Sequence, residues 1–441
     1  MSPEWLTVVM FGGLLVGLFL GHPLPFVLGG IAVIAGFLGP GPQVFGIIVN
    51  RIYGGVMDNY VLVAIPLFIL MARFLSDSGV TDRMFETLRL ALSRVRGGLT
   101  LAVVVVSVLL AATTGIVGAS ITVMGMIALR PMLEYGYQKE LSAGTVMASG
   151  TLGILIPPSI MLVLMASYSP LSVGELFAGS LIPGLTLGLA YALYVILVAT
   201  LRPEWAPPVG SEELAAVGRR EVAGRLLRHV LPPIGLILGV LGVLFTGVAT
   251  ATEASAIGAF LAFVMMVGYG QFTLRRFAQS LFETAKVTGM VMWVIVGATA
   301  FTGVFNVGGG MGMVQDLLLG SELSPGMLIF IMLLIVFVLG MFLDWTGIVL
   351  LSFPITLPVI EGMGQDPLWF VVMMAVMLQT SFLTPPFGYS LFYLKGVAPA
   401  EVGTLHLYRG IIPFVLIILG MIGLMALFPG LVTWLPEQLF G

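Results

Sequence analysis

Long apolar runs separated by short polar stretches dominate this chain and predict its secondary structure. A helix needs about 20 apolar residues to cross a bilayer core. The pattern predicts about ten transmembrane helices on that basis. They lie near residues 5–21, 24–40, 60–78, 142–168, 175–201, 230–250, 251–270, 283–304, 368–394 and 411–428.

Two further apolar regions, residues 99–129 and 327–357, have glycine-rich or polar centres. These centres are residues 113–120 and residues 344–347. Each half of such a region is short for a bilayer core of about 30 Å, at about 1.5 Å per residue. We expect both regions to be re-entrant hairpins that enter and leave the membrane on one side.

Two double prolines interrupt apolar runs that should otherwise be continuous helices. A proline lacks an N–H and clashes with the carbonyl four residues earlier, which frees that carbonyl. Pro157 and Pro158 free the carbonyls of Gly153 and Ile154. Pro385 and Pro386 free the carbonyls of Ser381 and Phe382. Bare carbonyls cost several kcal/mol in hydrocarbon, so they persist where they line a cavity or bind a cation. The pattern predicts broken helices at 142–168 and 368–394, and paired broken helices point to a transporter binding site.

The placement of lysine and arginine predicts the topology, because both residues favour cytoplasmic loops. Residues 80–98 hold four arginines, which places this segment inside. Residues 308–326 hold no cation, which places them outside. The same reasoning puts both chain termini outside, and Arg51 is the one clear exception to the rule.

Matching residues recur at an offset of 227–230 positions, which indicates an internal duplication. The pairs are Gly98 and Gly326, Pro131 and Pro358, Glu134 and Glu361, Gln138 and Gln365, Pro157 and Pro385, Pro170 and Pro399, and Pro183 and Pro413. Each half has an odd number of crossings, so the second half is inverted. We expect repeats at 1–201 and 230–441, joined by a cytoplasmic linker at 202–229. The alternative to a duplication is a set of unrelated helices in which prolines and glycines, common at helix ends, recur by chance.

Composition agrees with an all-α polytopic membrane protein: 59% of residues are hydrophobic, 9% are charged, and the mean hydropathy is +1.12. The chain has no cysteine, which excludes disulfides, thiolate catalysis and cysteine metal sites. Its three histidines lie near predicted membrane ends, and the sequence shows no hydrolase or metalloprotease motif. We expect neither an enzyme nor a nucleic-acid partner.

Oxygen atoms at the hairpin tips and helix breaks are the best candidates for binding. A helix N-terminus at each tip would attract an anionic substrate, and freed carbonyls would attract a hard cation such as Na⁺. The predicted substrate-binding residues are Gly118, Ala119, Ser120, Ser159, Thr346, Gly347 and Pro386. The predicted Na⁺-binding residues are Thr114, Gly115, Gly118, Gly150, Thr151, Gly153, Pro157, Asp344, Thr346, Gly347, Ser381, Thr384 and Pro385.

These side chains also have ordinary interpretations. Serine and threonine in membrane helices usually bond a preceding carbonyl or a neighbouring helix. Asp344 could act as a helix cap for a helix that starts at Trp345, because an acidic side chain favours a helix N-terminus. Asp344 can cap the helix and bind a cation at the same time.

Two long motifs, residues 109–125 and 148–160, resemble the large membrane subunit of tripartite ATP-independent periplasmic (TRAP) transporters, the DctM-like family. Thr250-Ala-Thr-Glu-Ala254 and Leu383-Thr-Pro-Pro-Phe-Gly388 fit its second half. The resemblance implies an elevator-type transporter in a bacterial inner membrane that imports organic acids with a Na⁺ gradient. It also implies two partners, a small four-helix membrane subunit and a periplasmic substrate-binding protein, and it makes the outer side, with both termini, periplasmic. Some relatives carry Gly-Ser-Ser at the first tip, where this chain has Gly118-Ala119-Ser120.

We therefore expect a Na⁺-coupled importer of an organic anion of the carboxylate class. The two hairpins and two broken helices would form a transport domain that slides against the remaining helices. A stand-alone dicarboxylate carrier or a Na⁺/H⁺ antiporter of related hairpin architecture is the first alternative. A membrane-embedded enzyme or a passive channel is the second.

Overall fold

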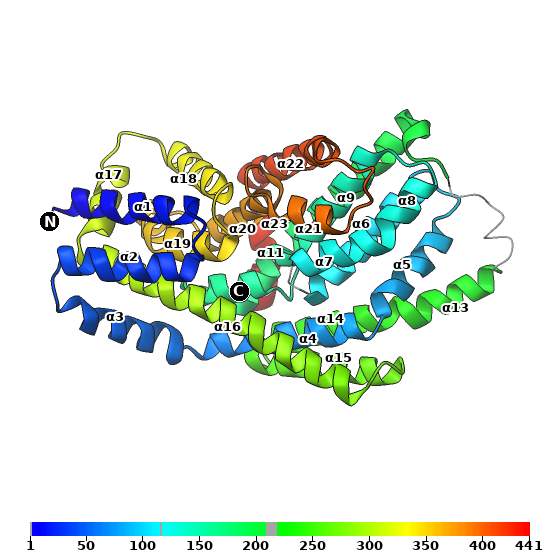
Figure 1. Cartoon of the computed structure of the whole chain (residues 1–441), viewed down its shortest axis with the longest axis horizontal. Helices are drawn as coiled ribbons and strands as arrows, with labels where there is room; N and C mark the ends of the chain where they lie inside the picture. The colour runs from blue at the N-terminus through cyan, green and yellow to red at the C-terminus, as the bar shows by residue number, and fades with distance from the viewer. Residues whose placement is uncertain (1, 115–116, 209–217) are drawn as a thin grey trace.

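The computed structural model describes residues 2–114, 117–208 and 218–441, and their regular structure is helical throughout (Figure 1). Eight of the described helices are long and apolar enough to cross a membrane. Six shorter apolar helices accompany them. The chain is an all-α polytopic membrane protein, as its apolar pattern predicts.

One set of helices, which we call the first group, packs around the long helix α16. Helix α16 contacts α2, α3 and α4, and α4 also contacts α15 along much of its length. The members are α1 (Pro3–Phe19), α2 (Leu24–Leu38), α3 (Val44–Ile52), the π-helix η1 (Tyr53–Met57), the 3₁₀ turn η2 (Tyr60–Val63), α4 (Ala64–Asp77), α14 (Leu231–Phe245), α15 (Ala251–Gly268) and α16 (Leu274–Val307).

A second group contains both predicted hairpins and both double prolines. Its members from the first half are α6 (Gly98–Thr114), α7 (Val117–Met124), η3 (Gly125–Leu129), α8 (Arg130–Glu134), α9 (Lys139–Thr151), η4 (Leu152–Ile154), α10 (Ile160–Ser167) and α11 (Val173–Leu201). Its members from the second half are α18 (Pro325–Gly340), α19 (Trp345–Gly362), α20 (Pro367–Leu383), α21 (Tyr389–Val397), α22 (Thr404–Leu427) and α23 (Gly430–Phe440). Helix α7 contacts α9 and α21, and α18 contacts α20.

Glycine permits the close packing of α9 on α22. A Cβ at Gly144 of α9 would collide with the backbone carbonyl of Gly410 on α22, and a Cβ at Gly410 would collide with the carbonyl of Glu140. The two backbones therefore approach each other where neither helix carries a side chain. Small residues commonly allow this in membrane helix pairs.

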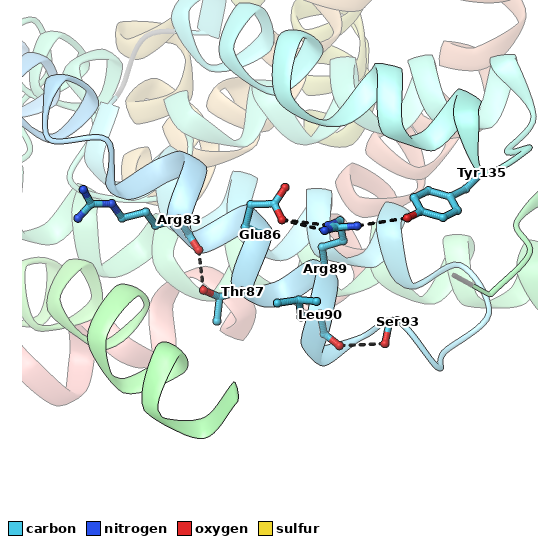
Figure 2. Close-up of polar contacts among 7 residues, drawn as sticks. All are labelled: Arg83, Glu86, Thr87, Arg89, Leu90, Ser93 and Tyr135. Carbon is cyan, nitrogen blue, oxygen red and sulfur yellow. Dashed lines mark hydrogen bonds and ion pairs between the residues drawn. The ribbon is translucent and has the colours of Figure 1, made fainter. Parts of the chain in front are cut away.

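Short helices join the two groups. They are α5 (Val80–Ala91), η5 (Pro203–Trp205), α13 (Arg219–His229) and α17 (Gly310–Leu319). Helices α5 and α13 contact each other and lie at one end of the long axis, whereas α17 lies at the opposite end (Figure 1). Figure 2 shows Arg89 of α5 held by Glu86, at 3.0 Å, and by the hydroxyl of Tyr135 after α8, at 3.4 Å. This contact ties α5 to the end of the first hairpin.

The observed helices extend beyond several predicted bounds. The first hairpin region spans residues 98–134 and the second spans 325–362, each a few residues longer than predicted. Residues 44–57 are helical, although the sequence pattern places no element there. Val44 and Ile48, one turn apart, are buried on one face of α3, and Arg51 lays its aliphatic stem against Gly303 of α16. This short amphipathic helix carries too few apolar residues to register as a span.

Candidate functional site

A cavity of about 520 Å³ lies where the two hairpins and the second helix break meet the first group. Val117 and Gly118 come from the tip of the first hairpin, and Asp344 and Thr346 come from the second. Its other lining residues are Leu18, Pro23, Leu24, Pro25, Phe26, Ile69, Ile160, Val287, Met290, Val291, Trp293, Val294, Phe342, Leu343, Trp345, Phe382, Tyr389 and Tyr393. We call it the central cavity. A cavity of this size accommodates a small organic molecule.

Three helices of the second group begin at the central cavity. Their first residues are Ile160 of α10, Trp345 of α19 and Tyr389 of α21, and all three line it. A helix N-terminus presents unpaired N–H groups and the positive end of the helix dipole. Three such ends beside one cavity contribute positive partial charge there without any cationic side chain.

Asp344 is the only charged residue among the described residues that line the central cavity. Its Oδ1 accepts a hydrogen bond of 3.2 Å from the backbone N–H of Gly347, so it is the N-cap of α19. Gly347 lies against Leu24 of α2, where a Cβ would come within 2.7 Å of Leu24 Cδ2. Asp344 therefore caps the helix and also places a carboxylate at the cavity.

Gly118 at the first tip lies against the ring of Tyr393 on α21. A Cβ at position 118 would lie 2.6 Å from Cζ of that ring, closer than real Cβ atoms approach other atoms. The glycine thus allows the first hairpin to contact the second broken helix directly. Gly118 and Thr346 lie 228 positions apart in the sequence, and both line the central cavity.

The first helix break is buried, and a side chain of the break itself bonds some of its free backbone groups. Ser159 donates a hydrogen bond of 2.5 Å to the carbonyl of Ile154, which Pro158 frees, and it accepts one from the N–H of Leu162 as the N-cap of α10. The carbonyl of Gly153 accepts no hydrogen bond from any described residue. Of the two carbonyls freed here, only that of Gly153 remains open to a ligand.

The second helix break is tied to the second hairpin. The N–H of Phe387 donates a hydrogen bond of 3.2 Å to the carbonyl of Met341, at the end of α18. The carbonyls of Ser381 and Phe382 accept no hydrogen bond from the described residues. The Ser381 hydroxyl donates to Leu378 O at 2.6 Å, which leaves its oxygen lone pairs able to accept.

Thr384 behaves in the same way as Ser381, since its hydroxyl donates to Thr380 O at 2.8 Å. Among the described residues, no three His, Cys, Asp or Glu side chains lie close enough to hold a metal ion together. A hard cation at the second break would therefore be bound mainly by carbonyl and hydroxyl oxygens. Those are ligands that suit Na⁺, an ion of low charge, better than a transition metal.

The structure brings only some of the predicted residues together. Gly118, Asp344 and Thr346 line the central cavity. Ala119 and Ser120 instead line a separate small pocket beside α4. The other predicted residues within the described chain lie at or beside the helix breaks and the second tip: Gly150, Thr151, Gly153, Pro157, Ser159, Gly347, Ser381, Thr384, Pro385 and Pro386. Gly115 and the side chain of Thr114 lie outside the described part of the chain.

Sequence reasoning missed three residues that the structure places at these sites. Tyr389 and Tyr393, one turn apart on α21, line the central cavity. The two tyrosines are four residues apart and follow the second double proline, so they lie on one face of the helix after the break. This pattern is a sequence signal that could have identified them. The third missed residue is Arg73, which lines a small pocket beside α4. Its position inside the apolar run 60–78 could have identified it, because charged residues inside membrane helices are rare.

Comparison with known proteins settles the family. The family profile described as the DctM component of the tripartite ATP-independent periplasmic transporter matches residues 11–431. The chain belongs to this family of TRAP transporter subunits. This membership confirms the resemblance seen in the sequence, and it confirms that the chain is a transporter subunit and not an enzyme.

Several curated relatives are similar over nearly their whole length. The C4-dicarboxylate TRAP transporter large permease protein DctM of Pseudomonas aeruginosa is 32% identical, and the match covers 87% of each chain. The sialic acid large permease SiaM of Vibrio cholerae is 29% identical over 89% of this chain and 90% of its own. The ectoine large permease TeaC of Halomonas elongata is 26% identical over 99% of this chain and 100% of its own.

A solved structure shares the fold. The crystal structure of the Alcanivorax borkumensis YdaH transporter superposes with a TM-score of 0.62 at 15% identity, covering 92% of this chain and 97% of that one. At this identity the likeness concerns the fold alone. It supports the arrangement of helices described above.

Proposed function

We propose that this chain is the large membrane subunit of a Na⁺-coupled importer of an organic anion of the carboxylate class. The convergence of three helix N-termini, those of α10, α19 and α21, on the central cavity is the observation that carries this proposal. Such ends favour a negatively charged group. The curated relatives transport C4-dicarboxylate, sialic acid and ectoine, as their names state, so the family alone does not fix the substrate.

Coupling to Na⁺ would resolve an electrostatic conflict in the cavity. Asp344 carries a carboxylate at the place where the anionic substrate would bind. When this carboxyl group is ionised, it and the anionic substrate repel each other in a site of low dielectric unless a cation lies near them. The unbonded carbonyls of Ser381 and Phe382 and the hydroxyl of Thr384 are the oxygens we assign to that cation.

The arrangement of the two groups supports an elevator mechanism. The second group, with the hairpins and broken helices, would move as a unit against the first group. The central cavity is lined by both groups, with Ile69 and Val291 from the first group and Thr346 and Tyr393 from the second. Movement of one group past the other would carry the bound substrate across the membrane.

Two protein partners follow from membership in this family. We propose a small four-helix membrane subunit and a periplasmic protein that delivers the substrate, in a bacterial inner membrane with both termini of this chain on the periplasmic side. We also retain the predicted inverted repeats at 1–201 and 230–441, with residues 202–229 as a cytoplasmic linker.

Reconstitution tests the function directly. The chain and its small subunit are placed in vesicles, and uptake is measured with the binding protein outside, with and without an inward Na⁺ gradient. Replacing Thr346 by valine should weaken uptake about tenfold, because a lost hydrogen bond to a charged group costs about 1.5–3 kcal/mol. Thr356→Val is the matched control, since Thr356 lies on the same helix and bonds only Ser352 O, at 3.0 Å.

The outcomes separate the alternatives. Na⁺-dependent uptake that requires the binding protein supports the proposal. Uptake by the chain without a binding protein would favour a stand-alone carrier. Uptake that ignores the Na⁺ gradient would refute the proposed coupling.

A further inference from the structure

Arg73 lies near the end of α4, partly buried, and forms no ion pair with a described residue. Its Nε is buried without a hydrogen-bond partner there, and no described carboxylate forms an ion pair with it. Asp77, one turn further along α4, accepts a hydrogen bond of 2.7 Å from Ser280 instead. A guanidinium without an ion-pair partner in a membrane helix is costly, so it marks a candidate functional site.

A pocket of about 30 Å³ opens beside Arg73. The hydroxyl-bearing residues Ser76, Thr81 and Ser120 line it together with the guanidinium-bearing Arg73. A space of this size exceeds the minimum that one water molecule needs, and it suits one small polar group. A positive charge among hydroxyl donors is the chemistry that binds a carboxylate or a small monovalent anion.

The pocket adjoins the central cavity along two helices. Ile69, one turn before Arg73 on α4, lines the central cavity. Gly118 of α7 lines the central cavity too, and the next two residues, Ala119 and Ser120, line the Arg73 pocket. The two spaces therefore lie on either side of the first hairpin tip, one helical turn apart.

We propose that the Arg73 pocket is a second anion subsite, which takes one carboxylate group of a small solute. It lies beyond the central cavity toward the end of α4 that charge placement predicts to be inside, where a departing substrate would meet it. Arg73 and Ser76 belong to the first group, and Ala119 and Ser120 belong to the second. An anion held there bridges the two groups and stabilises the arrangement seen in this structure. The subsite requires no Na⁺ coupling, so it stands or falls separately from the proposed function.

Thermal unfolding of the purified full chain in a neutral detergent tests the subsite, with sodium acetate as the probe. Sodium gluconate, too large for the pocket, keeps Na⁺ and ionic strength constant. Acetate should raise the Tm of the wild type saturably, by about 2 °C at ten times its half-saturating concentration. Arg73→Gln should abolish this rise, and Arg73→Lys should keep it with a higher half-saturating concentration, because lysine retains the charge.

Two control variants locate the effect. Arg51→Gln changes an exposed arginine on α3 and should leave the acetate response unchanged. Thr346→Val changes the central cavity, so it separates acetate binding there from acetate binding beside Arg73. No acetate response in the wild type, a full response in Arg73→Gln, or a response lost only in Thr346→Val would each overturn the proposal.

A further variant covers the case in which Arg73→Gln does not fold. Ser76→Ala removes one hydroxyl of the pocket and keeps the charge. It should raise the half-saturating acetate concentration at least about threefold, the effect of a lost hydrogen bond of modest strength. An unchanged acetate response in both Ser76→Ala and Arg73→Lys would equally overturn the proposal.

Discussion

The hydroxyl of Thr151 on α9 lies 3.0 Å from Oε1 of Gln379 on α20, and the two residues are 228 positions apart. The same offset separates Pro157 from Pro385. Thr151 also donates to the carbonyl of Ala148 at 2.8 Å, so its single proton has two acceptors. A rotated amide would instead donate from Nε2, which has no partner among the described residues as placed, to the Thr151 oxygen, and would leave the Thr151 proton to the carbonyl of Ala148. The contact joins corresponding positions of the two broken helices.

This contact predicts a specific pattern of stability loss. Thr151→Val leaves the buried Gln379 amide without its partner, which should cost about 1–3 kcal/mol. Gln379→Leu should cost less, because Thr151 keeps its bond to Ala148 O, and the double variant should cost less than the sum of both. Thermal unfolding of the four proteins in detergent measures the coupling.

The matched control for Thr151→Val is Thr145→Val on the same helix. Thr145 is buried and donates only to Leu141 O, at 2.7 Å. Its replacement should lower stability by less than about 1 kcal/mol, because it strands no other side chain. Strict additivity of the Thr151 and Gln379 changes would show that the two helices are not coupled through this pair.

The apolar pattern was sufficient to predict the all-α polytopic fold class, and the double prolines mark the gaps that separate α9 from α10 and α20 from α21. These features follow from local rules, such as the lost N–H at Pro157 and Pro385. The fate of the freed carbonyls could not be predicted in the same way. The hydroxyl of Ser159 donates a hydrogen bond to the carbonyl of Ile154. Only the path of the backbone around the break shows that the two groups come together.

Contacts between distant segments account for what could not be predicted from the sequence. The Gly118 and Tyr393 contact joins residues 275 positions apart, as the difference 393 − 118 shows. Ala119 and Ser120 point to the Arg73 pocket and not to the central cavity, because the tip of the first hairpin is helical from Val117 onward. Consecutive residues of a helix face different directions, so Gly118, Ala119 and Ser120 cannot all be assigned to one site from their adjacency in the sequence.

Membrane topology gives a second prediction, because the chain has no native cysteine. The single variants Val95→Cys and Glu322→Cys lie at a repeat offset of 322 − 95 = 227 positions, and both native residues are exposed. If the two repeats are inverted, an impermeant thiol reagent should label the Glu322→Cys variant from the periplasm. The same reagent should label the Val95→Cys variant only after the membrane is opened. Labelling of both variants from the same side would exclude inversion.

Close packing at the first tip gives a third prediction. Gly118→Ala introduces a Cβ 2.6 Å from the Tyr393 ring, so the ring or the tip must shift. Uptake should fall by about tenfold or more, since small displacements of a binding site are costly. Tyr393→Leu in the same chain should restore part of the loss by removing the ring. Gly423→Ala, where a Cβ meets nothing within 4 Å, should leave uptake unchanged.

Cation binding at the second break gives a fourth prediction. The double variant Ser381→Ala with Thr384→Ala removes two hydroxyl oxygens beside carbonyls that accept no hydrogen bond from the described residues. The Na⁺ concentration that gives half-maximal uptake should rise by about tenfold. Uptake at saturating Na⁺ should change much less, because the central cavity keeps Thr346 and its helix N-termini. Initial uptake rates in vesicles, measured against external Na⁺, give both quantities.

The matched control for that experiment is a second pair of buried hydroxyls in the same group of helices. Ser352 and Thr356 of α19 donate to Ile348 O and Ser352 O, as Ser381 and Thr384 donate to carbonyls of their own helix. Ser352→Ala with Thr356→Ala therefore removes equivalent hydroxyls without touching the break, and its Na⁺ dependence should match the wild type. An equal rise in both double variants would mean that the effect is one of helix packing. An unchanged Na⁺ dependence in the Ser381 and Thr384 variant would count against a cation site at the second break.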